Sequence, residues 1–160
     1  MAFDNKAPLF TRDFLLVCFA GTVTLIGLGL IIPLLPIYIS SKGASKFQLG
    51  IIFSGFSFTQ FLVQPFFGNL SDRIGRKPLL IAGLALYSAI TFLYAFAESF
   101  SMLFFLRLMH GIGAGMIWPP MTALIIDLAP PERRAEALGF QSGVEMTGFT
   151  IGPILGGVFY

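Results

Sequence analysis

Long apolar runs without charge dominate this sequence. Residues 14–39 contain no Asp, Glu, Lys or Arg, and a helix needs roughly 20 apolar residues to cross the hydrocarbon core of a bilayer. Only 11% of the 160 residues are charged, whereas a soluble chain averages about 25%. The composition therefore predicts an all-α polytopic membrane protein. It leaves no room for a sizeable water-soluble domain.

Five such helices fit into the chain, joined by short polar segments. We expect the spans at about residues 14–39, 47–70, 78–97, 100–126 and 135–160. Pro130 and Pro131, followed by Arg133 and Arg134, end the fourth run, because proline stops a helix and paired arginines mark the membrane boundary. Residues 1–160 thus form a single membrane unit.

The basic residues are divided unevenly between the two sides of this bundle. With the N-terminus inside, the cytoplasmic segments hold Lys6, Arg12, Arg73, Arg76, Lys77, Arg133 and Arg134, and the outer ones hold Lys42 and Lys46. Cytoplasmic loops of membrane proteins carry the excess of Lys and Arg. The distribution predicts a multi-pass protein of the plasma or inner membrane with a cytoplasmic N-terminus.

A glycine and proline pattern recurs along the chain. Gly27-x-Gly29-x-x-x-Pro33 reappears as Gly113-x-Gly115-x-x-x-Pro119, and Pro65-x-x-Gly68 reappears as Pro153-x-x-Gly156. Spans one and four would cross the membrane in opposite senses. The pattern therefore predicts an inverted repeat of three helices, an arrangement common in transporters.

The most specific motif separates the second and third runs and reads Gly68-Asn-Leu-Ser-Asp72-Arg73-Ile-Gly75-Arg76-Lys77-Pro78-Leu79. Gly75 permits a turn with positive φ, and Pro78 suits the first turn of a helix. Asp72 is within reach of two arginines, and charge-assisted hydrogen bonds between them would fix the turn. A solvated basic loop that only sets orientation is the alternative interpretation.

This motif resembles the signature loop between helices 2 and 3 of the major facilitator superfamily (MFS) of secondary transporters. The resemblance implies the first five helices of a six-helix half, built as a 3+3 inverted repeat. It implies a conformational-switch loop formed by Gly68, Asp72, Arg73, Gly75, Arg76 and Lys77. Family members have two such halves, so this chain would be incomplete, with the sixth helix and the C-terminal half as missing partners.

Three ionisable residues lie inside predicted spans. Arg107 lies about 10 Å along the helix axis from the outer end of the fourth span, where a charge costs about 2.5 kcal/mol or more unless it faces a cavity or a partner. His110 follows one turn later on nearly the same face. Glu145 lies near the bilayer midplane, where burial favours a protonated carboxyl group. It is therefore a candidate proton carrier. A snorkelling arginine and a hydrogen-bonded structural carboxyl are the alternatives.

Two further resemblances concern these spans. Leu103-x-x-x-Arg107-x-x-His110-Gly111-x-Gly113 is similar to the family's fourth-helix motif, whose arginine is associated with proton coupling and which usually has Gln where this chain has His110. Gly148-x-x-x-Gly152-Pro153-x-x-Gly156-Gly157 resembles the fifth-helix packing motif of the family's antiporters. Together they imply proton-coupled efflux of a small molecule, with Arg107, His110 and Glu145 as proton-coupling candidates.

Other functions find little support in the sequence. It has neither a Gly-x-Ser-x-Gly elbow nor a P-loop, and its one His and one Cys (Cys18) are far apart, unlike the ligands of a metal cluster. We therefore expect no enzyme, cofactor, metal site or nucleic-acid partner. Two alternatives stay open. One is a small membrane protein that assembles as a channel or half-size exporter, and the other is a nonfunctional or regulatory truncation.

Overall fold

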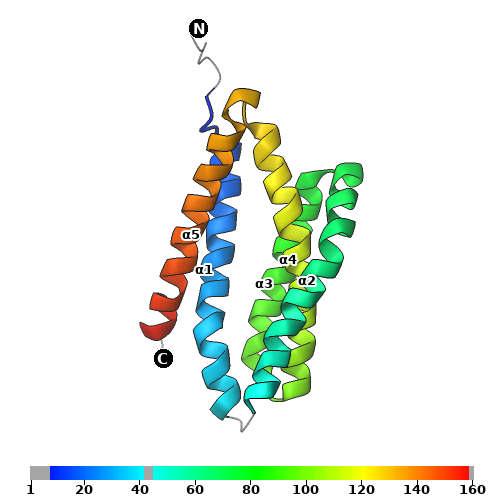
Figure 1. Ribbon diagram of the computed structural model, residues 1–160, viewed down its shortest axis with the longest axis vertical. Coiled ribbons are helices and arrows are strands. Elements are labelled where there is room, and N and C mark those ends of the chain that lie inside the picture. The colour runs from blue at the N-terminus through cyan, green and yellow to red at the C-terminus, as the bar shows by residue number, and fades with distance from the viewer. Residues whose placement is uncertain (1–7, 42–44, 159–160) are drawn as a thin grey trace.

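The computed structural model describes residues 8–41 and 45–158, and this part of the chain is almost entirely helical. Its long helices are α1 (Arg12–Ser41), α2 (Lys46–Ile74), α3 (Arg76–Leu93), α4 (Phe100–Leu128) and α5 (Arg134–Val158) (Figure 1). Two short 3-10 helices, η1 (Tyr94–Phe96) and η2 (Pro131–Arg133), extend α3 and precede α5. The predicted all-α fold is confirmed. Lys6 and Lys42, used above for the orientation, lie outside the described residues.

Four helices in the described ranges are long and apolar enough to cross a membrane. They are Arg12–Tyr38, Lys46–Ile74, Arg76–Phe96 and Phe100–Leu128. The 25 residues of α5 correspond to roughly 38 Å at 1.5 Å per residue, so its length is sufficient. Its polar Gln141 and Glu145 lower its mean hydropathy. That α5 is a fifth span therefore stays a prediction.

Side-chain caps define where two of these helices begin. Ser45 Oγ accepts a hydrogen bond from the Gln48 backbone N–H at 3.3 Å, and Gln48 Oε1 accepts one from the Ser45 N–H at 2.8 Å. This reciprocal capping box satisfies two donors that a helix start leaves free. Ser99 likewise accepts a hydrogen bond from the Met102 N–H at 3.2 Å, and α4 begins at Phe100, where the fourth span was expected to begin.

The connection between α2 and α3 is much shorter than the apolar runs suggested. We expected the second span to end near residue 70 and the third to begin at 78, but α2 continues to Ile74 and α3 starts at Arg76. The helices extend beyond the apolar runs because arginine and lysine, which occur in these extensions, are good helix formers outside the hydrocarbon. Gly75 alone joins them, with φ of 99°.

The five helices pack as a pair and a trio. α5 lies along α1, while α2 and α3 both pack against α4 (Figure 1). Contacts of α4 with α1 and α5 join the two groups. α4 is the most deeply buried of the four spanning helices, so its side chains form the interior of the bundle.

The inverted repeat is visible in this packing. A Cβ added at Gly68 of α2 would lie 3.8 Å from Pro119 of α4, and one added at Gly156 of α5 would lie 3.6 Å from Pro33 of α1. These glycines and prolines are the equivalent positions of the repeated pattern. α2 therefore packs on α4 as α5 packs on α1.

Replacing Gly75 by Ala is expected to destabilise the protein by about 1–3 kcal/mol, since its backbone lies in a region that side chains rarely adopt. Thermal unfolding in detergent would measure the loss. Gly139→Ala is the matched control, because Gly139 is an exposed helical residue whose added Cβ would meet nothing within 4 Å. Equal stability of the two variants would contradict the expectation.

Candidate functional site

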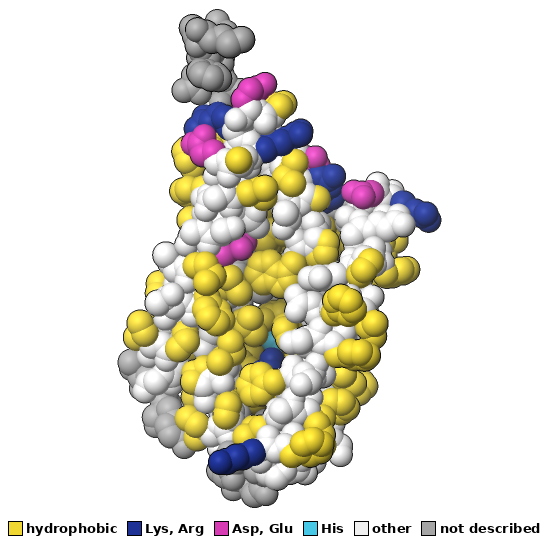
Figure 2. All heavy atoms as spheres, in the orientation of Figure 1, with side chains coloured by type: hydrophobic (Ala, Val, Ile, Leu, Met, Phe, Trp, Pro, Cys, Tyr) yellow, Lys and Arg dark blue, Asp and Glu magenta, His cyan; other side chains and the backbone are white. Residues whose placement is uncertain are grey.

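The site lies where α2, α3 and α4 meet. Arg107 and His110 of α4 are 1% and 0% exposed, so neither reaches the molecular surface. In Figure 2 this face of the molecule has a hollow in its middle, and a histidine (cyan) and a basic side chain (dark blue) are visible deep inside it. Two charged or titratable groups are thus enclosed at the centre of an apolar bundle.

Aromatic rings, not a carboxylate, surround the Arg107 guanidinium. Its Cζ lies 4.9 Å from the ring centroid of Phe53, 5.5 Å from that of Phe56 and 5.8 Å from that of Tyr94. Its Nε and Nη2 have no hydrogen-bond partner within the described part of the chain. Each cation–π contact contributes about 0.5–2 kcal/mol, so three of them offset much of the cost of holding this charge in the membrane.

His110 has polar contacts on both ring nitrogens. Its Nε2 lies 3.4 Å from Thr91 Oγ1, and its Nδ1 lies 3.4 Å from the Tyr94 hydroxyl. The ring of Tyr87 packs over the imidazole with 3.8 Å between ring centroids. All three partners come from α3 and the turn that extends it. The sequence analysis missed them, although positions 87, 91 and 94 share the i, i+4, i+7 spacing of one helix face.

Glu145 reaches the junction of α1, α4 and α5. It accepts a hydrogen bond from Gln141 Nε2 at 2.9 Å, and its carboxyl lies directly against Gly21 of α1, beside Met121 of α4. Gly21 therefore leaves the space that this carboxyl occupies. No ion pair joins Glu145 to Arg107 within residues 8–41 and 45–158. The supporting residues Gly21 and Gln141 were also missed.

The residues of the signature motif gather around Arg76. Arg76 forms an ion pair with Asp127 at the end of α4 and donates a hydrogen bond to the Ala123 carbonyl. The Asp72 carboxylate lies 3.5 Å from its Nη2. Arg76 thus connects the end of α2, the start of α3 and the end of α4. Arg73 and Lys77 are exposed, and Gly68 packs near Pro119 as described above.

The glycines of the fifth-helix motif face α1. A Cβ at Gly148 would lie 2.6 Å from the Thr22 carbonyl oxygen, and one at Gly152 would lie 2.6 Å from Gly29 Cα. Pro153 and Gly156 continue this contact, whereas an added Cβ at Gly157 would meet nothing within 4 Å. Small residues at such positions let membrane helices approach closely, and here they bring Glu145 against α1.

Comparison with known proteins identifies the family. The model of the Major Facilitator Superfamily matches residues 17–160. The chain belongs to this superfamily. It is therefore a multi-pass membrane protein. The members of this family transport small molecules and are not enzymes.

Similar proteins include two resistance proteins. Quinolone resistance protein NorA of Staphylococcus aureus is 37% identical over 132 residues, which cover 82% of this chain and 34% of NorA. Multidrug resistance protein 1 of Bacillus subtilis (strain 168) is 37% identical over 135 residues, which cover 84% of this chain and 35% of the relative. The chain thus spans about a third of the length of these relatives.

Arg107→Met is expected to change the free energy of unfolding by less than about 1 kcal/mol, because the cation–π contacts and the desolvation of the charge nearly cancel. Arg107→Ala should cost about 2–5 kcal/mol, because it leaves a cavity. Unfolding of both variants in detergent would test this. A methionine variant as unstable as the alanine variant would mean that the charge itself maintains the fold.

Proposed function

We propose that this chain is the N-terminal part of a proton-coupled efflux transporter, an antiporter that exchanges protons for a small, amphiphilic molecule. The observation that carries the proposal is the enclosure of Arg107 at membrane depth with aromatic contacts and without a carboxylate partner in the described residues. Ionisable residues held inside a membrane mark substrate and proton pathways. The names of the two relatives, for quinolone and multidrug resistance, support export as the direction.

In this proposal Glu145 carries the proton. Its carboxyl is half-buried, with one hydrogen bond from Gln141, so it can gain a proton without breaking an ion pair. Arg107 contributes a fixed positive charge, and His110 is the third proton-coupling candidate. Release of the proton restores the carboxylate, whose charge a cation in the hollow would stabilise.

The signature motif serves as the conformational switch in the proposal. The ion pairs of Arg76 hold the ends of three helices together, while Asp72, Arg73 and Lys77 are exposed and available to the other half of a complete transporter. Rocking of the halves would make and break such contacts. We place these residues and the N-terminus on the cytoplasmic side because the basic residues gather there.

An open flank on α1 supports the proposal that a sixth helix and a C-terminal half complete the protein. A Cβ added at Gly113 of α4 would lie 3.4 Å from Tyr87 of α3, whereas one added at the equivalent Gly27 of α1 would meet nothing within 4 Å. Gly27 instead lines a pocket of about 430 Å³ between α1 and α3.

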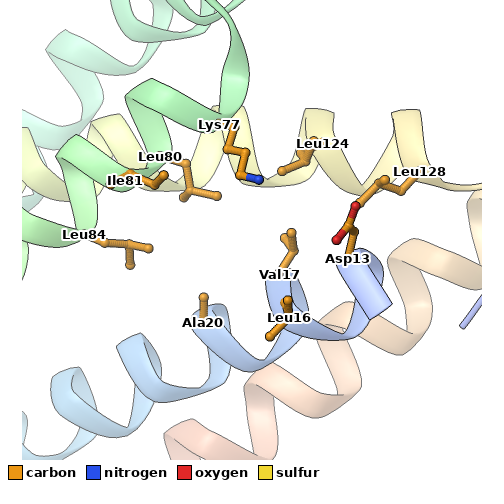
Figure 3. Close-up of a pocket in the computed structure, with 10 residues that line it drawn as sticks. All are labelled: Asp13, Leu16, Val17, Ala20, Lys77, Leu80, Ile81, Leu84, Leu124 and Leu128. Atoms are coloured by element: carbon orange, nitrogen blue, oxygen red, sulfur yellow. The ribbon is translucent and has the colours of Figure 1, made fainter. Parts of the chain in front are cut away.

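A neighbouring pocket extends this open flank. It has a volume of about 230 Å³ and lies among α1, α3 and α4, with Leu16 and Val17 facing Leu80 across it (Figure 3). By the repeat, a sixth helix would pack on α1 as α3 packs on α4.

Glu145→Gln, placed in the complete transporter, is expected to abolish efflux driven by a proton gradient, because an amide cannot carry a proton. Uptake of a fluorescent amphiphile into inverted membrane vesicles, whose outer face is the cytoplasmic one, would measure it. Glu136→Gln is the control on the same helix, since Glu136 is exposed and accepts two hydrogen bonds of 2.7 Å from Arg133. Proton-driven efflux by the Glu145 variant at the normal rate would reject the proposal.

The proposal that this chain is part of a longer transporter makes a separate prediction about size. Intact mass spectrometry of the native polypeptide from its membrane is expected to show a species well over twice the 17.4 kDa of this chain. A stable product of 17.4 kDa would instead favour a channel, a half-size exporter or a truncation.

A further inference from the structure

The hydroxyl of Thr91 has a fixed direction. It lies 2.9 Å from the Tyr87 carbonyl oxygen, one turn earlier in α3. A carbonyl only accepts hydrogen bonds, and a hydroxyl has a single hydrogen to donate. The Thr91 hydrogen is therefore used by Tyr87, and toward His110 the Thr91 oxygen can act only as an acceptor.

This direction determines the state of the imidazole. Because His110 Nε2 faces the Thr91 oxygen at 3.4 Å, Nε2 must carry a hydrogen to make this bond. A neutral imidazole has one N–H donor and one bare acceptor nitrogen, so Nδ1 is the acceptor. The Tyr94 hydroxyl, 3.4 Å from Nδ1, is then its donor.

We propose that Tyr94, His110, Thr91 and the Tyr87 carbonyl form one directed hydrogen-bond chain, which holds His110 as the neutral tautomer protonated at Nε2. In this chain Tyr94 O–H donates to Nδ1, Nε2–H donates to Thr91, and Thr91 O–H donates to the carbonyl. Tyr94 and Thr91 are positioning residues, because they act through His110. The tautomer of a histidine is set by the partners of its two nitrogens in this way.

The surroundings of His110 favour its neutral form. Arg107 lies one turn away on the same helix, and the rings of Phe56, Tyr87 and Tyr94 pack against the imidazole. None of these groups offers a negative charge to a second cation. If Nδ1 carried a proton, it would donate to the Tyr94 hydroxyl, and the direction of that hydrogen bond would be reversed.

Tyr94 connects His110 to Arg107. Its hydroxyl contacts Nδ1, and its ring lies under the Arg107 guanidinium. A shift of Tyr94 therefore changes the contacts of both residues together. Any role of Tyr94 in transport rests on the proposed function, whereas the direction of the hydrogen-bond chain does not.

Solid-state NMR of the 160-residue chain in lipid bilayers, with its histidine labelled with ¹⁵N, tests the proposal directly. The chain has one histidine, so its two ring signals need no assignment to a residue. At neutral pH we expect a protonated Nε2 and a bare Nδ1. A protonated Nδ1, whether in the other neutral tautomer or in an imidazolium, would overturn the proposal.

Substitutions test the members of the hydrogen-bond chain one at a time. Thr91→Val removes the acceptor of Nε2–H, so a population protonated at Nδ1 should appear, whereas Thr91→Ser should keep the original tautomer. Tyr94→Phe should keep the Nε2 proton and shift the Nδ1 signal toward that of a nitrogen without a donor. Tyr38→Phe, which removes a hydroxyl that donates to the Ala97 carbonyl, should leave both signals unchanged.

An unchanged spectrum of the Thr91→Val protein would also contradict the chain. The spectrum of the unaltered protein decides the tautomer even where a variant fails to fold. The NMR spectrum does not depend on transport. It can therefore contradict the hydrogen-bond chain although proton-driven efflux is observed, and it can support the hydrogen-bond chain although efflux is absent. The two proposals are therefore tested independently.

Discussion

Close packing of α4 is the constraint on which the rest of the structure depends. A Cβ added at Gly111 would lie 2.5 Å from the Phe56 carbonyl oxygen of α2, and Gly115 lies directly against Val63 of the same helix. Gly113 faces α3 instead, against Tyr87. In a bilayer, where lipid is as apolar as the helices, association depends on such close contacts. These glycines bring two helices onto α4 and enclose Arg107 and His110.

The enclosed charge is compensated in an unusual way. A buried ion pair would lock Arg107 to one partner, and breaking it would be costly. Aromatic faces give several weaker contacts, which leave two guanidinium nitrogens without hydrogen bonds in the described residues. The charge is thus tolerated but not neutralised. Glu145, on the other side of the bundle, is similarly held by a single neutral partner.

The sequence predicted the fold well and the site in part. Hydropathy located the four helices that are long and apolar enough to span, because such a run of apolar residues is seldom found for another reason. It misplaced the ends of α2 and α3, since polar residues can continue a helix beyond the hydrocarbon. The repeated Gly and Pro positions predicted the inverted repeat, whereas the pairing of α2 with α4 and of α5 with α1 comes from the structure.

The partners of the ionisable residues could not be predicted in the same way. The apolar residues of α4 are spread around its whole circumference. Its sequence therefore has no amphipathic pattern that would show which side of the helix faces which neighbour. Without that rotation, nothing in the sequence connects Arg107 with Phe53 or His110 with Thr91. These contacts depend on the packing of three helices.

The single residue between α2 and α3 has a mechanical consequence. One residue reaches at most about 3.6 Å, so the adjoining ends of these two long helices cannot move apart or slide past each other. The start of α3 must therefore follow any displacement of the end of α2. A displacement of the charged residues near Asp72 thus also moves the start of the helix whose opposite end carries Thr91, the residue that faces the imidazole.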